Sequence, residues 1–135
     1  MKILGIDIGT TTITALLLDA SRGNILKSCT LKNDSFISGR PFEKLQSPQK
    51  IIETVKTAIE EICGDTRPDA IGVTGQMHGI LYLDGSFAPC SPLMIWQDER
   101  GNEFFKDNLT YAQHLTAETG IKPPQALVLP LIFTT

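Results

Sequence analysis

The chain contains no apolar run that approaches the roughly 20 residues needed to span a bilayer. It also has no cluster of lysine and arginine, and its net charge of −3 argues against a nucleic-acid surface. Its three cysteines are an odd number without metal-binding or redox spacing, so we expect reduced, mostly packed thiols. No apolar segment with a small-residue cleavage site follows Lys2, and we therefore expect a cytoplasmic protein.

Two common nucleotide-binding motifs are also missing. The absence of G-x-x-x-x-G-K-[ST] excludes a P-loop ATPase, and without G-x-G-x-x-G dinucleotide binding is unsupported. The length of 135 residues suits one compact domain with a real core. An apolar content of 41% with 20% charged residues is ordinary for a globular protein, so function must be sought in local segments.

Three short apolar runs open the chain, at residues 2–8, 13–19 and 25–31, with turn residues between them. Because parallel neighbours need a long crossover connection, strands joined this closely are expected to pair antiparallel. Residues 33–46 have the composition of an irregular loop.

The next segment has the pattern of an amphipathic helix that Ser47 caps, Pro48 begins and Gly64 closes. The apolar residues on its predicted buried face are Ile51, Ile52, Val55, Ala58, Ile59, Ile62 and Cys63. A short, buried strand is expected to follow over residues 70–74. The order βββαβ predicts an α/β domain with a mixed sheet.

Further elements are expected beyond that strand. Residues 80–83 are hairpin-like and turn at residues 84–86, and residues 92–96 are predicted to form another short strand. Residues 99–109 and 110–118 have helical composition.

The first segment with chemical potential is Asp7, in the first strand, with the turn that follows it. An isolated buried carboxylate is costly, so an Asp among isoleucines needs a partner. The turn consists of Gly9, Thr10, Thr11 and Thr12, whose N–H and O–H groups can bind an anion. A carboxylate able to face a hard cation, beside such a turn, indicates nucleotide phosphate with magnesium. The alternative is a hairpin in which these residues only cap the turn.

Two more segments follow strand ends. Gln76-Met77-His78-Gly79 should face the same cleft as the Asp7 turn if the two strands are neighbours, because ligands of open α/β sheets bind beyond the carboxyl ends of strands. For His78 the alternative is a hydrogen-bonded structural histidine. In the other segment, Trp96 with Asp98 fits a sugar site, which needs an apolar plate edged by polar groups. The alternatives are a core position for Trp96 and a helix N-cap for Asp98.

In this order, the three segments resemble the start of a carbohydrate kinase of the FGGY family. Residues 5–11 resemble its first phosphate motif, residues 73–79 the sugar-site loop of its ketose kinases, and residues 96–100 its W-x-D-x-R segment. The resemblance extends from residue 2 to about residue 124. The loop at residues 76–79 is most similar to that of sedoheptulokinases, with xylulokinases as a near alternative.

The resemblance implies a ribonuclease-H-like, actin-type ATPase fold and transfer of the γ-phosphoryl group of ATP to a ketose hydroxyl. It implies that Asp7 helps to hold Mg²⁺ through water while residues 9–12 approach the phosphates. The residues it assigns to the sugar are Gln76, Met77, His78, Trp96 and Asp98. The family's catalytic base is an aspartate further along, so no catalytic residue is expected in this chain, which alone should be inactive.

The resemblance divides the chain into a partial amino-terminal kinase domain, residues 1–124, and an atypical apolar tail, residues 125–135. One hypothesis makes the tail a frame-shifted segment of the family sequence, and ordinary divergence is the alternative. We expect a sugar and ATP as partners, with neither nucleic acid nor membrane, and self-association through exposed apolar surface. Two other functions stay open: a non-catalytic sugar- or partner-binding module, and another phosphotransferase of actin-like fold.

Overall fold

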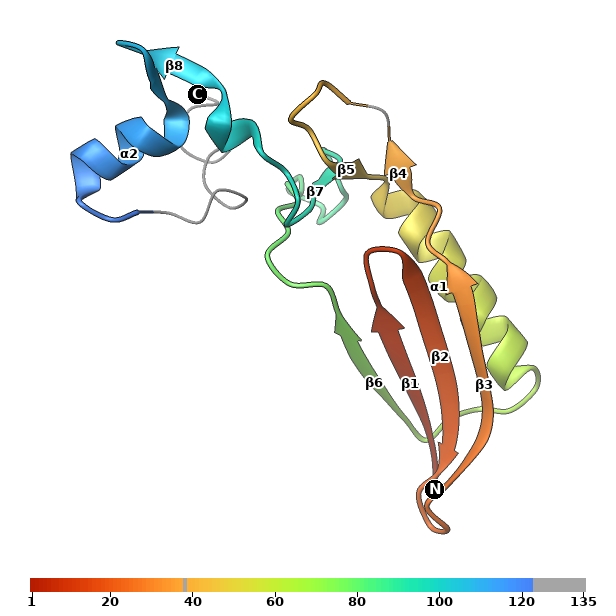
Figure 1. The fold of residues 1–135 in the computed structure, drawn as a ribbon. Coiled ribbons are helices and arrows are strands. Elements are labelled where there is room, and N and C mark those ends of the chain that lie inside the picture. The colour runs from red at the N-terminus through yellow and green to blue at the C-terminus, as the bar shows by residue number, and fades with distance from the viewer. Residues whose placement is uncertain (38, 123–135) are drawn as a thin grey trace. The chain divides into compact units, whose positions relative to one another are not determined.

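The computed structural model describes residues 1–37 and 39–122 (Figure 1). The chain forms two compact units rather than the single compact domain that its length suggests. The first unit contains Met1–Ser35 and Ser47–Gln76. The second contains the described residues of Phe36–Gln46 and of the chain from Met77 to residue 122. The tail predicted over residues 125–135 lies outside the described residues.

The first unit is built on a four-stranded mixed sheet, as predicted. Its strands are β1 (Lys2–Ile8), β2 (Thr12–Asp19), β3 (Asn24–Lys32) and β6 (Ala70–Gly75). Their order in the sheet is β3-β2-β1-β6, with β1, β2 and β3 antiparallel and β6 parallel to β1. The parallel pairing is possible because the chain crosses over through a helix between β3 and β6.

That helix, α1 (Pro48–Cys63), has the predicted ends. The Ser47 side chain accepts a hydrogen bond from the Lys50 N–H at 3.3 Å, and Gly64 caps the other end at φ 48°. Figure 1 shows α1 alongside β2 and β3, on which it packs. The helix residues that are buried are Ile51, Ala58, Ile62 and Cys63. The sheet residues that are buried are Leu4, Ile6, Ile13, Ala15 and Leu17, which alternate along β1 and β2.

The expectation that residues 70–74 form a buried strand is wrong in one respect. The strand is present, but every residue of β6 is exposed, with Ile71 at 59% and Val73 at 64% of full exposure. The reason is the position of β6 at one edge of the sheet, whereas α1 packs mainly on β2 and β3. An apolar strand composition therefore did not indicate burial here.

The second unit contains shorter elements. A three-stranded sheet has the order β4-β5-β7, with all pairs antiparallel. Its strands are β4 (Phe36–Ile37), β5 (Leu45–Gln46) and β7 (Leu93–Met94). The prediction of an irregular loop over residues 33–46 missed β4 and β5, and the strand predicted over residues 92–96 is reduced to β7. Two-residue strands leave no room for the alternating pattern from which a strand is predicted.

The helix predicted over residues 99–109 is wrong. This segment contains a 3₁₀ turn, η1 (Arg100–Asn102), and a hairpin of β8 (Phe104–Lys106) with β9 (Leu109–Thr110). Asp107 and Asn108 connect the hairpin with φ values of 53° and 57°. Two successive left-handed residues are typical of a type I′ hairpin turn, for which Asp and Asn are favoured.

The other predicted elements of this unit are confirmed. The turn expected at residues 84–86 is held by Asp84, whose Oδ1 accepts hydrogen bonds from the N–H groups of Ser86 and Ala88 at 2.8 and 2.9 Å. The final helix is α2 (Tyr111–Thr119), and Thr110 and Gln113 form a capping box at its start. None of the helices in the described part of the chain is long and apolar enough to span a membrane.

The three cysteines are free thiols with different surroundings. Cys63 is buried, Cys29 is half-buried and Cys90 is exposed. Burial, and then the nearby charge of Glu61, raise the pKa of the Cys29 thiol above its ordinary value. A raised pKa disfavours the reactive thiolate, so Cys29 is suited to packing, as expected.

Candidate functional site

The turn between β1 and β2 is shaped by a close approach of two backbone segments. The Gly9 N–H donates a hydrogen bond to the Thr12 carbonyl at 2.9 Å. A Cβ atom at position 9 would lie only 2.9 Å from the same carbonyl oxygen, so a side chain cannot be placed there without moving the backbone. Glycine is therefore required for this turn, and Thr11 and Thr12 stand exposed on it.

Asp7 is exposed, which corrects the expectation of a buried carboxylate. The alternation along β1 places it on the opposite face of the sheet from Leu4 and Ile6. In the sheet register its partners are Thr14 of β2 and Thr74 of β6. Paired residues point to the same face, so hydroxyl side chains flank the Asp7 carboxylate on both sides.

Asn33 holds the turn from the end of β3. Its side-chain nitrogen donates to the Gly9 carbonyl at 2.8 Å, and its backbone N–H donates to the Thr11 carbonyl at 2.8 Å. The residue is only 2% exposed. Sequence reasoning missed Asn33, because a polar residue directly after a strand has the composition of any loop and its contacts join segments more than 20 residues apart.

The strand pairing brings Gln76 to the same turn. The Thr10 hydroxyl donates a hydrogen bond to the Gln76 side-chain carbonyl at 2.8 Å. The Gln76 N–H donates to the Ile8 carbonyl at 2.9 Å, and a Cβ atom on Gly75 would lie 3.0 Å from that oxygen. The ends of β1 and β6 are thus in direct contact, because the two strands are neighbours in the sheet.

Met77 and His78 belong to the second unit. Met77 is 71% exposed, and His78 is exposed with a φ of 61°, a left-handed value that is uncommon for a residue with a side chain. Residues held in such a conformation often mark functional sites. Gly79 follows, where a Cβ atom would lie 3.3 Å from the Met94 carbonyl.

The chain after this loop pairs with β7, which leads to Trp96. Ile80 and Met94 form an antiparallel bridge with hydrogen bonds of 2.8 and 2.9 Å. His78 and Trp96 each lie two residues from this bridge, at its same end, so the backbone brings their segments together. Trp96 is 45% exposed, which makes its ring available to a ligand and argues against a core position.

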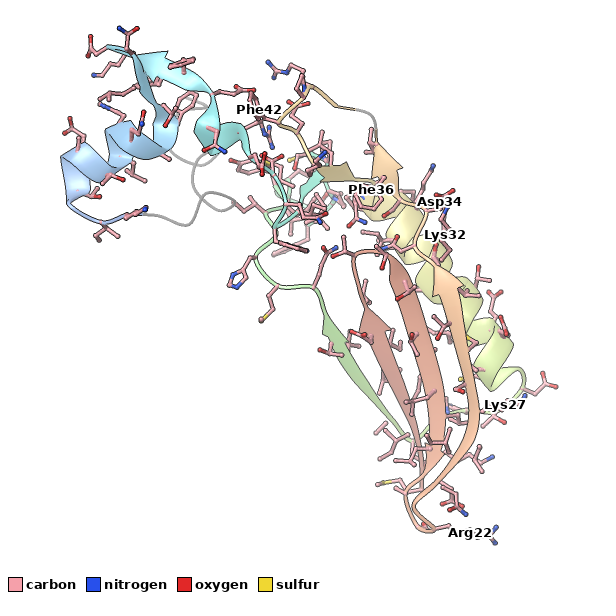
Figure 2. All side chains as sticks on the ribbon, viewed as in Figure 1. Arg22, Lys27, Lys32, Asp34, Phe36 and Phe42 are labelled. Atoms are coloured by element: carbon pink, nitrogen blue, oxygen red, sulfur yellow. The ribbon has the colours of Figure 1, made fainter. Side chains whose placement is uncertain are left out.

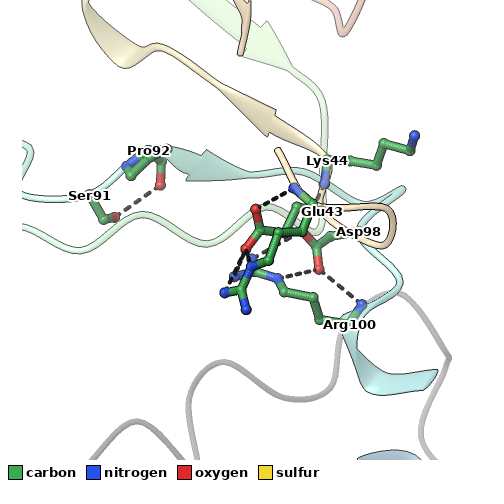
Figure 3. A network of polar contacts seen from close by, with 7 residues as sticks. Glu43, Lys44, Ser91, Pro92, Asp98 and Arg100 are labelled. Carbon is green, nitrogen blue, oxygen red and sulfur yellow. Dashed lines mark hydrogen bonds and ion pairs between the residues drawn. The ribbon is translucent and has the colours of Figure 1, made fainter. Parts of the chain in front are cut away.

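Asp98 is buried, and both of its carboxylate oxygens are bonded within the protein (Figure 3). One oxygen accepts from the Arg100 N–H at 3.2 Å and from its Nε at 2.9 Å. The other accepts from Arg100 Nη2 and from the Lys44 N–H, both at 3.0 Å. This bidentate ion pair fixes the segment around residue 44 against the chain that carries Trp96.

Glu43 extends the same network. Its Oε1 lies 3.1 Å from Arg40 Nη2 and 3.7 Å from Arg100 Nη1. The backbone N–H of Arg40 donates to the carboxylate and is the main cause that lowers the pKa of Glu43 below its ordinary value. Burial acts in the opposite direction, and the charges of Arg40 and Arg100 lower the pKa further.

A separate groove on the first unit contains none of the predicted site residues. It is lined by Leu31, Lys32, Asp34, Lys50, Glu53, Thr54 and Thr57. Figure 2 shows Lys32 and Asp34 at the end of β3, where Lys32 Nζ lies 3.1 Å from Asp34 Oδ1. Both side chains are about 80% exposed, so their pair adds little to stability.

Among the described residues, no three side chains of His, Cys, Asp or Glu lie together as a metal site. A metal ion at Asp7 would therefore have at most two such protein ligands among the described residues. Magnesium tolerates this, because it commonly keeps several waters and uses one or two carboxylates with substrate phosphates. The exposed Asp7 carboxylate and the adjoining turn without a Cβ at Gly9 fit a magnesium–phosphate group.

Comparison with known proteins identifies the family to which the chain belongs. Residues 2–125 match the N-terminal domain of the FGGY family of carbohydrate kinases. The chain belongs to this family. It is 33% identical over 144 residues to the sedoheptulokinase of Mus musculus, in an alignment that covers 87% of the chain and 30% of that enzyme. It is 31% identical over 107 residues to a xylulose kinase of Staphylococcus epidermidis, which covers 74% of the chain and 21% of that enzyme.

A solved structure supports the same FGGY assignment. The crystal structure of a xyloylose kinase from Brucella ovis superposes with a TM-score of 0.73 at 28% identity, over 89% of the chain and 24% of that kinase. The fold is therefore the actin-like, ribonuclease-H-like fold of FGGY kinases. The chain spans less than a third of the length of each of these three relatives.

Proposed function

We propose that this chain provides the phosphate-binding turn and the sugar-binding loop of an ATP-dependent kinase for a ketose similar to sedoheptulose or xylulose. The observation that carries the proposal is the hydrogen bond from Thr10 to Gln76. It joins a glycine-threonine turn at the end of β1 to the start of the loop after β6. Kinase catalysis depends mostly on positioning two substrates, and adjoining strand ends suit that task.

On the nucleotide side, Asp7 would hold Mg²⁺ through water, and Gly9, Thr10, Thr11 and Thr12 would approach the phosphates. When held there, Mg²⁺ would supply positive charge to neutralise the phosphates. The chain's own contribution is a turn of fixed shape, with an exposed carboxylate and hydroxyl groups next to it. The acceptor of the hydroxyl proton is not assigned to a residue of this chain.

On the sugar side, Met77 and His78 would contact hydroxyl groups, and the ring of Trp96 would cover an apolar sugar face. Gln76 would orient this loop through its bond with Thr10. For Asp98 we propose a positioning role in place of the sugar contact expected from the sequence, because both of its oxygens already accept hydrogen bonds.

The activity test uses the complete gene product with MgATP and a panel of sedoheptulose, xylulose and glycerol. We expect ketose-dependent ADP formation that stops when Mg²⁺ is removed. Asp7→Ala should abolish turnover while sparing sugar affinity, and His78→Ala should raise the ketose KM. The ring of His114, the other histidine of the chain, lies tilted against that of Phe105 with 5.0 Å between the ring centroids, and His114→Ala is the matched control. An unchanged KM in His78→Ala would show that the sugar assignment is wrong.

Trp96 is the only tryptophan of the 135-residue chain, so in this polypeptide its fluorescence reports sugar binding directly. Adding a ketose should shift or quench the emission, and glycerol should have a smaller effect. Ketose binding by the complete gene product without any phosphoryl transfer would instead favour a non-catalytic binding module.

We also propose a cytoplasmic location, where ATP is abundant and the three free thiols stay reduced. Self-association is proposed through the exposed apolar residues Ile71 and Val73 on the edge strand β6. Sedimentation of the wild type against Val73→Lys tests it, and an unchanged mass distribution would contradict it.

For the domain division, we propose residues 1–124 as kinase domain and residues 125–135 as a frame-shifted segment. The family match stops at residue 125, which supports this division. Reading the gene in all three frames tests it. A neighbouring frame without a family-like sequence would contradict the hypothesis.

A further inference from the structure

Asn33 is the most deeply buried polar residue in contact with the phosphate turn. Its side-chain nitrogen and its backbone N–H reach the carbonyls of Gly9 and Thr11, each at 2.8 Å. These two residues flank Thr10. The contacts come from the end of β3, which is not itself part of the turn.

The two contacts leave the turn little freedom. A carbonyl oxygen can only accept, so the Asn33 amide nitrogen must be the group that faces Gly9. The N–H of Gly9 already donates to Thr12, so the two hydrogen-bonding groups of the Gly9 backbone are both engaged within the protein. Asn33 is only 2% exposed and its bond to the Gly9 carbonyl is partly buried, so this bond holds the turn more firmly than a fully exposed bond would.

We propose that Asn33 is a positioning residue that holds the Gly9–Thr12 turn in its phosphate-receiving conformation before the nucleotide arrives. This inference rests on the proposed function, since it takes the turn to be the phosphate site. Asn33 acts through the carbonyls of Gly9 and Thr11. When the turn is already ordered, the protein loses less conformational entropy on binding a nucleotide. Nucleotide affinity should therefore depend on Asn33.

Ser35 provides a matched control two residues away. It is fully buried, as Asn33 nearly is, and its hydroxyl has no hydrogen-bond partner within the described residues. Its carbonyl accepts from the Ser47 N–H at 2.8 Å, a backbone bond that survives substitution by alanine. Ser35→Ala therefore removes a buried polar group from the same segment without touching the turn.

The test compares Asn33→Ala, Asn33→Asp and Ser35→Ala in the complete gene product. Asn33→Ala should raise the KM for ATP about tenfold, as expected for one lost hydrogen bond, and change the ketose KM by less than about twofold. Asn33→Asp keeps the shape but replaces the donor by an acceptor, so its effect should be at least as large. Ser35→Ala should leave both KM values unchanged. An equal rise of both KM values, or no rise, would overturn the inference.

A second readout separates this inference from the proposed function. Amide exchange measured by NMR without any substrate should show the Gly9 N–H exchanging about tenfold faster in Asn33→Ala than in wild type, and at the wild-type rate in Ser35→Ala. If the protein phosphorylates no ketose, the kinase proposal fails while this result still supports the ordering role of Asn33. Unchanged exchange would refute that role even in an active kinase. If Asn33→Ala does not fold, the nearly isosteric variant Asn33→Asp takes its place in the exchange measurement, with the same expected result.

Discussion

The two units of the molecule are stabilised by different means. The first unit has long strands and a helix around an apolar core, in which Leu4 and Ile13 are fully buried. The second has strands of two or three residues, and polar contacts centred on Asp98, Arg100 and Glu43 hold its chain together (Figure 3). The contrast indicates that the first unit is a rigid support for the Gly9–Thr12 turn. In the second unit the network of Asp98, Arg100 and Glu43, here called the clasp, supports the chain that carries Trp96.

The largest effect should come from the core of the first unit. Leu4→Ala removes a fully buried side chain from β1 and should lower the free energy of unfolding by about 3 kcal/mol. Ile25→Ala, at an exposed position on β3, should cost less than about 0.5 kcal/mol. Urea unfolding followed by circular dichroism measures both. Equal, small losses would show that the core does not stabilise this unit.

A somewhat smaller effect is expected from the clasp of the second unit. Arg100→Leu would leave the buried Asp98 carboxylate without its bidentate partner and should cost about 2 kcal/mol. Arg100→Lys should recover only part of the loss, because lysine cannot form the fork-shaped pair.

Trp96 fluorescence in urea measures this unfolding. Arg22→Leu is the control, because the Arg22 side chain is 79% exposed in its pair with Asp19. Circular dichroism follows this variant, since Arg22 lies in the first unit, and its stability should change by less than about 0.5 kcal/mol. A loss for Arg100→Leu no larger than for Arg22→Leu would mean that the clasp is not a stabilising network.

The same contrast explains what could be predicted from the sequence. In the first unit, strands β1 to β3 were placed to within one residue, and α1 has the predicted caps Ser47 and Gly64. Long elements repeat their pattern several times, so periodicity locates them. In this unit the predictions of burial were wrong for Asp7 and for the strand β6, which are both exposed. Whether a strand residue is buried depends on what packs against its side of the sheet.

In the second unit the strands are too short for a repeating apolar pattern to reveal them. The hairpin of β8 and β9 was mistaken for a helix, although the pair Asp107-Asn108 was a usable turn signal. The candidate site shows the same limit. Gln76 could be placed near the turn from strand order, whereas Asn33 and the bond from Lys44 to Asp98 depend on tertiary contacts that no local pattern encodes.

The smallest predicted effect concerns Glu43 and acid. The folded pKa of Glu43 lies below its ordinary value of 4.5, so the ionised carboxylate stabilises the fold above that pH. The contribution is lost as the pH falls through the folded pKa. Glu43→Gln should therefore be less stable than wild type near neutral pH, by about 1 kcal/mol or less because the partner Arg40 is largely exposed.

Urea unfolding at a series of pH values checks this. The difference between wild type and Glu43→Gln should shrink on acidification below pH 4.5 and should already be reduced near neutral pH in an Arg40→Gln background. A difference that grows with acid would mean that the pKa is raised in the fold. Since the core of the first unit contains no such ion pair among its buried residues, acid should weaken the clasp of the second unit before it weakens that core.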